Sequence, residues 1–305
     1  QTLVRIVLSI YVGLTAITII ALKLSGLNWF DSLCQAMSAC STCGFSNKNL
    51  SVGHFNSPVV ELILIVAMLI AGMHFGLIYA TLTRKPNNIF RSEVTRSYLL
   101  MFALSSVMIA ISLRAADIYP TALSSLRHAA FQTASLMTTS GFATADCNTW
   151  TPFAILILMF CSLICGCAGS TSGGLKVDRL VLALKMLKNK LQSQQHPNVI
   201  MRIKVDGFCQ DQSMLNGVMV YIVAFMLLVL IGTFINTLFG CDLMTGFSAT
   251  LACASNVGPG FGEVGTMDNY SSMPVIVKMC LSFVMLFGRL EIFGLVQLFF
   301  MRWWK

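Results

Sequence analysis

Three segments of the sequence join a short apolar stretch to a loop that contains glycine. The stretches are DSLCQAMSAC (31–40), SSLRHAAFQTASLM (124–137) and DLMTGFSATLACAS (242–255), followed by STCGFSNKNL, TTSGFATADC and SNVGPGFGEV. Main-chain carbonyl oxygens can replace the hydration shell of a cation, and glycine adopts the backbone angles that turn several of them toward one axis. The C-terminal end of a helix carries a partial negative charge, which favours a cation over an anion. The pattern therefore predicts a cation site made of main-chain oxygens.

The three loops recur at long intervals. Gly44, Gly141 and Gly258 are 97 and 117 residues apart, and the polar stretch 189–212 lies within the longer interval. One such loop alone could be an ordinary turn, because turns favour the same residues. Three loops in the same order, each after a short apolar stretch, favour a repeated architecture in which the loops share one function.

The composition is that of a membrane protein. Of the 305 residues, 56% are hydrophobic and 10% are charged, with a mean hydropathy of +0.78, whereas a soluble domain carries about 25% charge. A helix needs roughly 20 apolar residues to cross a bilayer. Candidate spans are 4–22, 59–82, 98–113, 153–165, 214–239 and 275–301, and 175–187 continues the fourth span after a glycine-rich break.

The stretches before the loops are too short to cross and predict re-entrant helices. Asp31, Ser124 and Asp242 are the expected N-caps, because their side chains can accept hydrogen bonds from the first turn. Unpaired backbone is tolerated at membrane depth only when it is buried in protein or lines a cavity. We therefore expect the loops to line a site filled with water or ions.

Positive charges gather in two linkers. The first holds Arg84, Lys85, Arg91 and Arg96, and the second holds Lys176, Arg179, Lys185, Lys188, Lys190, Arg202 and Lys204. The positive-inside rule predicts that both linkers are cytoplasmic, and the order of the spans places them on the same side. Contact with anionic lipids fits the same residues. The net charge of +8 thus indicates membrane topology rather than nucleic-acid binding.

The motifs also resemble those of one known family. TTSGFATADCNTW, GCAGSTSGGLKVDR, NVGPGFGE and FGRLEIF, with AGMHF (71–75) and STCGFS (41–46), are similar to the membrane subunit of Trk/Ktr-type potassium uptake systems, of the TrkH type. The resemblance runs over essentially the whole chain. It implies an all-α membrane protein in which helix–pore-loop–helix repeats surround a central ion pore, as in a potassium channel.

The family has four such repeats, and this chain is similar to three of them. The resemblance implies a second repeat at 1–96, a third with an intramembrane gating loop at 97–190, a cytoplasmic linker at 191–212 and a fourth repeat at 213–305. We therefore expect that the first repeat and its loop are missing and that the chain is a fragment.

The resemblance also implies the ion ligands residue by residue. Potassium would be bound by the carbonyls of a selectivity filter made of Thr42, Cys43, Gly44, Phe45, Thr139, Ser140, Gly141, Phe142, Asn256, Val257, Gly258 and Pro259. Cys43 stands where the family often has glycine, a change that leaves a main-chain ligand in place. Glycine at all three loop centres favours potassium over sodium, because a bulkier residue would distort the ring of carbonyls.

A second glycine-rich segment, GCAGSTSGGLK (166–176), interrupts an apolar run. It lacks the Gly-Lys-Ser/Thr ending of a phosphate-binding loop, and a flexible hinge or a packing face of small residues is an alternative. The resemblance implies a gate beneath the filter, made of Gly166, Gly169, Ser170, Thr171, Ser172, Gly173, Gly174 and Lys176.

The resemblance adds Arg289 to the gate, because it implies that this arginine faces the pore below the filter. An ionisable residue at membrane depth indicates a function and calls for a partner. The alternative for Arg289 is a structural ion pair with Glu291 or Asp178.

Five other polar residues have structural interpretations. His74 is expected to be buried and hydrogen-bonded in a helix whose Gly72 and Gly76 form a small-residue contact, and Glu61 is expected at the interface or in packing. Arg127 and His128 would cap or brace the second short helix. Asp146 and Glu263 lie just outside their loops, where they would attract cations or remain exposed loop charges without consequence.

The eleven cysteines follow no framework of loop spacings, and we interpret those in apolar segments as small buried hydrophobic residues. A zinc site at Cys161, Cys165 and Cys167 lacks nearby histidine or acidic partners. The apolar spans also hold no Ser-His-Asp, HExxH or paired-carboxylate pattern, so the sequence predicts no enzyme.

The resemblance implies potassium uptake across the cytoplasmic (inner) membrane by a multi-pass protein with a gated, channel-like pore. Alternatives are a sodium-permeable or mixed monovalent cation transporter of the same fold, or an assembly subunit that does not conduct. Potassium is expected as the transported ion, without an organic cofactor. The implied partners are membrane lipid, a second copy in a homodimer and a cytoplasmic ring of nucleotide-binding regulatory subunits.

Overall fold

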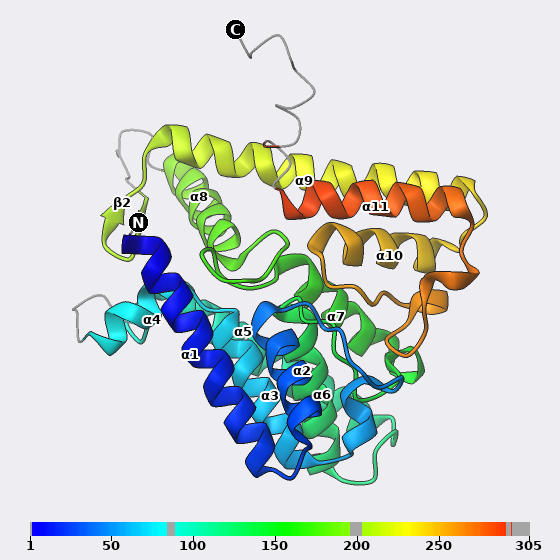
Figure 1. The fold of residues 1–305 in the computed structure, drawn as a ribbon. Coiled ribbons are helices and arrows are strands. Elements are labelled where there is room, and N and C mark those ends of the chain that lie inside the picture. The colour runs from blue at the N-terminus through cyan, green and yellow to red at the C-terminus, as the bar shows by residue number, and fades with distance from the viewer. Residues whose placement is uncertain (1, 84–88, 196–202, 291–293, 295–305) are drawn as a thin grey trace, which may run out of the picture.

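The computed structural model describes residues 2–83, 89–195, 203–290 and 294, and this part of the chain is mostly helical (Figure 1). The α-helices are α1 (Thr2–Leu24), α2 (Trp29–Ser41), α3 (Pro58–Ala71), α4 (Phe75–Leu82), α5 (Glu93–Ala115), α6 (Ala122–Met137), α7 (Pro152–Ile164), α8 (Val177–Gln195), α9 (Gln212–Leu238), α10 (Leu243–Ser255) and α11 (Val275–Arg289). Short 3-10 turns are η1 (Ser51–Phe55), η2 (Cys147–Thr149), η3 (Gly262–Val264) and η4 (Tyr270–Ser272), and β1 (Lys204–Val205) pairs with β2 (Phe208–Cys209) in an antiparallel hairpin.

The helices form three units of the same order. A long helix, a short helix, a loop and a second helix follow one another in α1–α2–α3, in α5–α6–α7 and in α9–α10–α11. Each short helix packs against the long helix before it, and α3 packs on α6 while α7 packs on α10. The last helix of one unit therefore lies against the short helix of the next. The predicted all-α fold with repeated re-entrant helices is confirmed.

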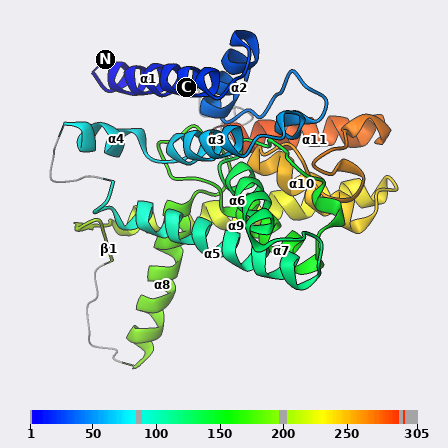
Figure 2. The same ribbon diagram turned by 90° about the horizontal axis from the view of Figure 1, so that it is seen from below.

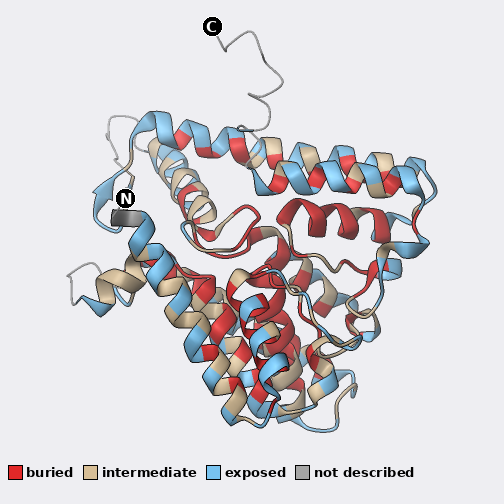
Figure 3. Ribbon diagram, viewed as in Figure 1, coloured by how far each residue is buried: buried red, intermediate tan, exposed pale blue. Residues whose placement is uncertain are grey.

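Burial separates the short helices from the long ones. In Figure 3, α6 and α10 are largely buried, whereas α1, α9 and α11 carry many exposed residues. Many of these are large and apolar, such as Leu8, Phe234 and Phe283. In the described part of the chain α1, α5 and α9 are long and apolar enough to cross a membrane, and α3 and α4 qualify when counted together. The exposed apolar faces suit contact with lipid tails.

The predicted span 59–82 is wrong as a single helix. It breaks after Ala71, and α4 leaves α3 at an angle of 99°. Gly72 ends α3 where no side chain fits, since a Cβ atom there would lie 2.5 Å from the Tyr98 hydroxyl. His74 begins α4 by accepting a hydrogen bond from the Gly76 backbone N–H at 3.0 Å. Gly72 and Gly76 therefore do not share one helix face, and the predicted small-residue contact is wrong.

The second break lies where the sequence predicts it. Helix α7 ends at Ile164, Cys165 adopts a left-handed φ of 64°, and residues 166–176 cross to α8 without helix. Helix α8 extends away from the other helices in Figure 2. The last predicted span begins as α11, and its part from 291 onward, Glu291 included, lies outside the described residues, apart from residue 294.

The described end of the linker expected at 191–212 contains a hairpin, β1 and β2. Its hairpin docks on the N-terminus of α5, where Asp206 accepts hydrogen bonds from the Ser92 hydroxyl at 2.8 Å and the Glu93 backbone N–H at 2.6 Å. Lys185 of α8 contacts the Glu93 carboxylate and the Lys204 carbonyl. The hairpin thus ties α8 to α5.

The N-cap predictions hold at one helix of three. Asp242 caps α10 and accepts the Met244 N–H at 3.1 Å, as expected. Helices α2 and α6 begin earlier, at Trp29 and Ala122, with Asn28 and Thr121 in the N-cap positions. Asp31 and Ser124 therefore lie in the first turn, and the two predicted caps are wrong.

Candidate ion site and gate

The three short helices end in the same way. Thr42, Thr139 and Asn256 follow α2, α6 and α10 in a left-handed conformation, with φ values of 53°, 59° and 57°. Their N–H groups donate to carbonyls three residues back, at 3.1–3.3 Å, and the next N–H donates five residues back, at 2.9–3.1 Å. This is the Schellman pattern, which satisfies carbonyls at a helix end. Left-handed threonine costs free energy, so the tertiary structure must enforce the same backbone shape three times.

Two residues further on, each loop turns left-handed again at its glycine. Gly44, Gly141 and Gly258 have φ values of 72°, 74° and 103°. Two left-handed residues separated by one other residue reverse the direction of successive peptide groups, so that neighbouring carbonyls are brought toward one side. The alternation is the backbone feature expected of a carbonyl site.

The loops lie in the order of the sequence, each against the next. A Cβ atom placed on Gly44 would lie 1.6 Å from the Ser140 carbonyl oxygen, and one on Gly141 would lie 2.3 Å from the Val257 carbonyl oxygen. A Cβ atom on Gly258 would meet no atom of the described residues within 4 Å. Loop 1 (41–50) therefore touches loop 2 (138–147), and loop 2 touches loop 3 (255–264).

Residues of all three loops line one cavity of about 410 Å³. It is lined by Ser41, Thr42, Cys43, Gly44, Phe45, Ser140, Gly141, Asn256, Val257, Gly258, Pro259, Met285 and Arg289. Ten of the twelve predicted filter residues are in this set. Thr139 and Phe142 are not, because Thr139 contacts the gate segment and the Phe142 carbonyl accepts a hydrogen bond from Ser135 at 2.6 Å.

The outer ends of the loops are fastened to one another. Asn148 pairs with the backbone of Gly262 through two hydrogen bonds of 2.9 Å, and Thr266 donates to the Ala145 carbonyl at 3.0 Å. The Gly53 N–H donates to the Ala143 carbonyl at 3.1 Å and so joins loop 1 to loop 2. These contacts hold the three loops as one frame.

The segment 166–176 lies against all three loops from the side opposite the fastened ends. Thr42 donates its hydroxyl to the Thr171 carbonyl at 3.1 Å, and the Gly173 N–H donates to the Thr139 hydroxyl at 3.1 Å. A Cβ atom on Gly173 would lie 2.6 Å from the Ser255 carbonyl, which adjoins the third loop. The three left-handed helix ends thus form the seat of this segment.

The break in α3 supplies a second seat. The carbonyls of Ala71 and Gly72 accept hydrogen bonds from the N–H groups of Thr171 at 3.4 Å and Cys167 at 2.9 Å. The Gly169 carbonyl in turn accepts from the Phe75 N–H at 3.2 Å. Buried carbonyls at a helix end need partners, so the two breaks satisfy each other.

A cavity of about 490 Å³ adjoins the segment, and Arg289 borders this cavity and the loop cavity alike. Its lining includes Gly169, Ser170, Thr171, Ser172, Gly173, Gly174, Lys176 and Arg289. Of the predicted gate residues, Gly166 is absent from the lining because it packs against Ser172 and Gly72.

Arg289 contacts the segment directly. Its Nη1 donates to the Thr171 carbonyl at 3.2 Å, the same oxygen that Thr42 contacts. The alternative partner Asp178 accepts the Ala168 backbone N–H instead, and Glu291 lies outside the described residues. Arg289 is thus placed between the loops and the segment beneath them.

Several other predictions meet the structure differently. His74 is exposed rather than buried, because it caps α4 beside the break. Glu61 is 2% exposed, which fits packing, the second of its two alternatives, rather than the interface. Its carboxylate accepts two hydrogen bonds from the Arg127 guanidinium, at 2.6 and 2.7 Å. Arg127 therefore braces the second short helix against α3, as one alternative had it, while His128 stacks on Tyr119.

The loop charges and the cysteines follow simpler patterns. Asp146 caps η2 and Glu263 is exposed, so their attraction of cations stays a prediction. Cys161, Cys165 and Cys167 are buried, in keeping with their interpretation as small hydrophobic residues. Cys43 is exposed, with its sulfur 3.3 Å from the Ser38 hydroxyl.

Two contacts at the site were not predicted from the sequence, namely the role of the Thr42 and Thr139 side chains and the contact of Tyr270. The hydroxyls of Thr42 and Thr139 bind the gate segment, and Tyr270 donates to the Gly258 carbonyl at 2.6 Å. Aligning the three repeats on their glycines would have placed both threonines at one position. Tyr270 lies twelve residues after Gly258, beyond any local pattern.

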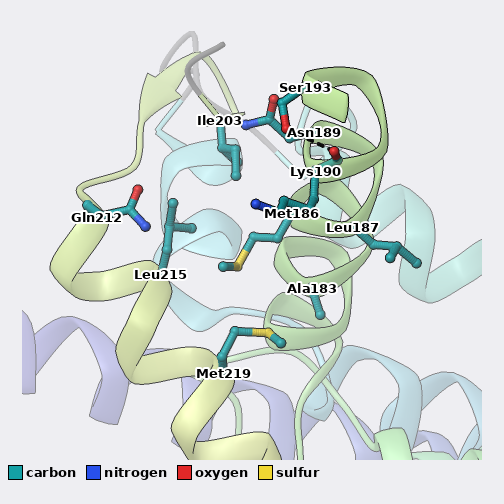
Figure 4. A pocket seen from close by; sticks show the side chains of 10 residues that line it. All are labelled: Ala183, Met186, Leu187, Asn189, Lys190, Ser193, Ile203, Gln212, Leu215 and Met219. Carbon is teal, nitrogen blue, oxygen red and sulfur yellow. Dashed lines mark hydrogen bonds between the residues drawn. The ribbon is translucent and has the colours of Figure 1, made fainter. Parts of the chain in front are cut away.

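A separate cavity of about 550 Å³ lies between α8 and α9. Figure 4 shows the side chains of Met186 and Met219 directed into the space between the two helices, with Lys190 and Gln212 at its polar edge. It belongs to the basic region that the positive-inside rule assigns to the cytoplasm.

Comparisons with known proteins agree over nearly the whole chain. The sequence model of the TrkH family, described as "Cation transport protein", matches residues 1–302. The Trk system potassium uptake protein TrkH of Salmonella typhimurium is 34% identical over 297 residues, covering 97% of this chain and 61% of that protein. TrkG of Escherichia coli is 30% identical over 288 residues, covering 94% and 59%.

A solved structure shares the fold. The crystal structure of the potassium transporter TrkH from Vibrio parahaemolyticus matches with a TM-score of 0.91 and 32% identity, covering 97% of this chain and 64% of that one. The chain thus spans about 61% of the length of the curated TrkH proteins it matches.

Proposed function

Because the chain belongs to the TrkH family of cation transport proteins, we propose that it forms three quarters of a potassium-selective, gated pore. The family is one of transporters and not of enzymes, and the chain is a multi-pass membrane protein of the bacterial inner membrane. The observation that carries the proposal is the common cavity of three loops with the same alternating left-handed backbone.

Potassium is the proposed ion, bound by carbonyls of residues 42–45, 139–142 and 256–259. A desolvated cation needs several oxygens in place of its water, and residues of three loops line one cavity. The open side of Gly258 suits a fourth loop of the same kind, as a fourfold pore requires. We assign the units 1–96, 97–190 and 213–305 to the second, third and fourth repeats, with 191–212 as the linker.

The proposed gate is the segment from Gly166 to Lys176. It closes the inner side of the loops through Thr42 and Thr139, and Arg289 adds a positive charge at the same place. That charge opposes the passage of a cation in a site shielded from water. Transport requires the segment to move, so the hydrogen bonds of the Thr171 carbonyl must break on opening.

The proposed partners are a second copy of the protein and a cytoplasmic ring of nucleotide-binding subunits. The basic helix α8 and the cavity between α8 and α9 are accessible on the side assigned to the cytoplasm. Helix α8 follows the gate segment directly and is tied to α5 by the linker hairpin. A partner that moves α8 would therefore pull on the gate.

The test of the proposed function is uptake by the full-length gene product in cells that lack their own potassium uptake. We expect growth at low potassium and uptake of rubidium in preference to sodium. Replacing Gly258 by serine should weaken that preference, because its φ of 103° disfavours any side chain. Equal rubidium and sodium uptake by the parent protein would favour the mixed-cation alternative, and no uptake would refute the proposal.

A further inference from the structure

Tyr270 forms a direct contact with the third loop. Its hydroxyl donates to the Gly258 carbonyl oxygen at 2.6 Å, from the start of η4 in the segment that returns from the loop to α11. The ring packs against a buried cluster that includes Phe225 and Ala254. Burial raises the pKa of the Tyr270 phenol, so the hydroxyl keeps its proton at neutral pH and acts as the donor.

The first two loops are braced in another way. Six residues before the central glycine, α2 carries Ser38 and α6 carries Ser135. The Ser135 hydroxyl donates to the Phe142 carbonyl at 2.6 Å, and the Ser38 hydroxyl lies 3.3 Å from the Cys43 sulfur. In α10 the equivalent residue is Ala252, which has no hydroxyl. The third short helix cannot brace its loop from this position.

The Gly258 carbonyl accepts its hydrogen bond from outside α10. It is the carbonyl of the central glycine itself, whereas Ser135 donates to the carbonyl one residue after its glycine. Gly258 has a left-handed φ of 103°. A change of its backbone angles would also turn the neighbouring Val257 carbonyl, which faces loop 2.

We propose that Tyr270 is a positioning residue for the third filter loop, which holds the Gly258 peptide in the orientation that ion selection requires. Tyr270 supplies from outside the loop the hydroxyl that Ala252 lacks in the short helix. The inference rests on the proposed function, since it assigns Tyr270 a share in the discrimination between potassium and sodium.

The experiment compares Tyr270→Phe with the parent full-length protein in cells without their own potassium uptake. The substitution keeps the ring and removes the hydroxyl. Rubidium and sodium uptake are each measured over a range of concentrations and normalised to the amount of protein in the membrane. We expect the rubidium-over-sodium ratio to fall about fivefold, the effect of one ordinary hydrogen bond, with the change in the KM values rather than in the maximal rate.

A matched control and a rescue separate positioning from general damage. Tyr119→Phe removes a hydroxyl from a ring stacked on His128, outside the loop cavity, and should leave the ratio unchanged. Adding Ala252→Ser to Tyr270→Phe restores a hydroxyl at the position of Ser38 and Ser135. It should recover part of the ratio, because at this position Ser135 donates to its loop one residue after the central glycine.

Each outcome decides the inference. An unchanged ratio in Tyr270→Phe at normal abundance would overturn it and leave the proposed function intact. If Tyr270→Phe lowers the amount of protein in the membrane, the double variant decides, because recovery of abundance without recovery of the ratio, or recovery of neither, contradicts a positioning role. Absence of rubidium uptake by the parent protein would instead overturn the proposed function and this inference with it.

Discussion

The Thr171 carbonyl is the point where the proposed gate meets the loops, and removing one of its two donors should raise basal transport. Thr42 Oγ1 lies 3.1 Å and Arg289 Nη1 lies 3.2 Å from this oxygen. Thr42→Val keeps the branched shape at a left-handed residue and removes the hydroxyl. A neutral hydrogen bond contributes about 1 kcal/mol net, so the closed state should lose about that much. The ratio of open to closed protein should then rise about fivefold.

The assay is rubidium efflux from proteoliposomes that contain the full-length protein without any regulatory partner. Thr237→Val is the matched control, because the Thr237 hydroxyl donates to carbonyls of its own helix. Combining Thr42→Val with Arg289→Gln should give less than the product of the single effects, since both donors act on one oxygen. Basal efflux that does not change in Thr42→Val, with normal folding, would refute the assignment of Thr171 as the closing contact.

Three further outcomes test the site and its support. Gly141→Ala should reduce rubidium selectivity more than Gly240→Ala, because both strain a left-handed residue but only the first places a Cβ atom 2.3 Å from a backbone oxygen. Equal losses would contradict the contact between the second and third loops. Glu61→Gln should destabilise the protein by about 3 kcal/mol, because it leaves Arg127 without its charged partner. Thermal unfolding in detergent measures this loss, and an unchanged unfolding temperature would show that the brace is dispensable. Cys43→Ser should leave the rubidium-over-sodium ratio unaltered, because the proposed ligand there is the main-chain carbonyl; a marked change would mean that the side chain takes part.

The repeated architecture could be predicted because the same order of residue types occurs three times in the sequence. Stretches too short to cross a membrane, each followed by a central glycine, occur three times, and they become α2, α6 and α10 within a few residues of the expected bounds. The start of α10 was exact because Asp242 is a capping residue with no helical residue before it. The starts of α2 and α6 lie earlier than predicted. Thr121 caps α6 by accepting the Ser124 N–H, whereas Asn28 holds the N-cap position of α2 without a side-chain hydrogen bond.

The left-handed residues that end the short helices could not be predicted from residue type. Thr42 and Thr139 are β-branched and disfavour this conformation, and only the packing of the loops against one another enforces it. The same holds for the Glu61–Arg127 pair, whose partners are 66 positions apart in the chain. A hydrophobic pattern reports which face of a helix is buried, but it does not report which polar groups meet inside.

The break in α3 shows most clearly why the glycine-rich break at 166–176 could be predicted from sequence and the surface that it packs against could not. The run 59–82 is continuously apolar apart from Glu61, Gly72, His74 and Gly76, so hydropathy alone joins α3 to α4. The break leaves the Ala71 and Gly72 carbonyls without helical partners, and such groups cost several kcal/mol each at membrane depth unless they are paired.

The segment 166–176 removes that cost, because the N–H groups of Cys167 and Thr171 donate hydrogen bonds to these carbonyls. Movement of the segment would expose them again together with the hydroxyls of Thr42 and Thr139. In the open state, water must therefore replace the segment as the hydrogen-bond partner of these carbonyls and hydroxyls. If the segment is the gate, opening must hydrate the inner cavity and draw its free energy from outside the pore, and for this reason we propose a cytoplasmic partner that acts through α8.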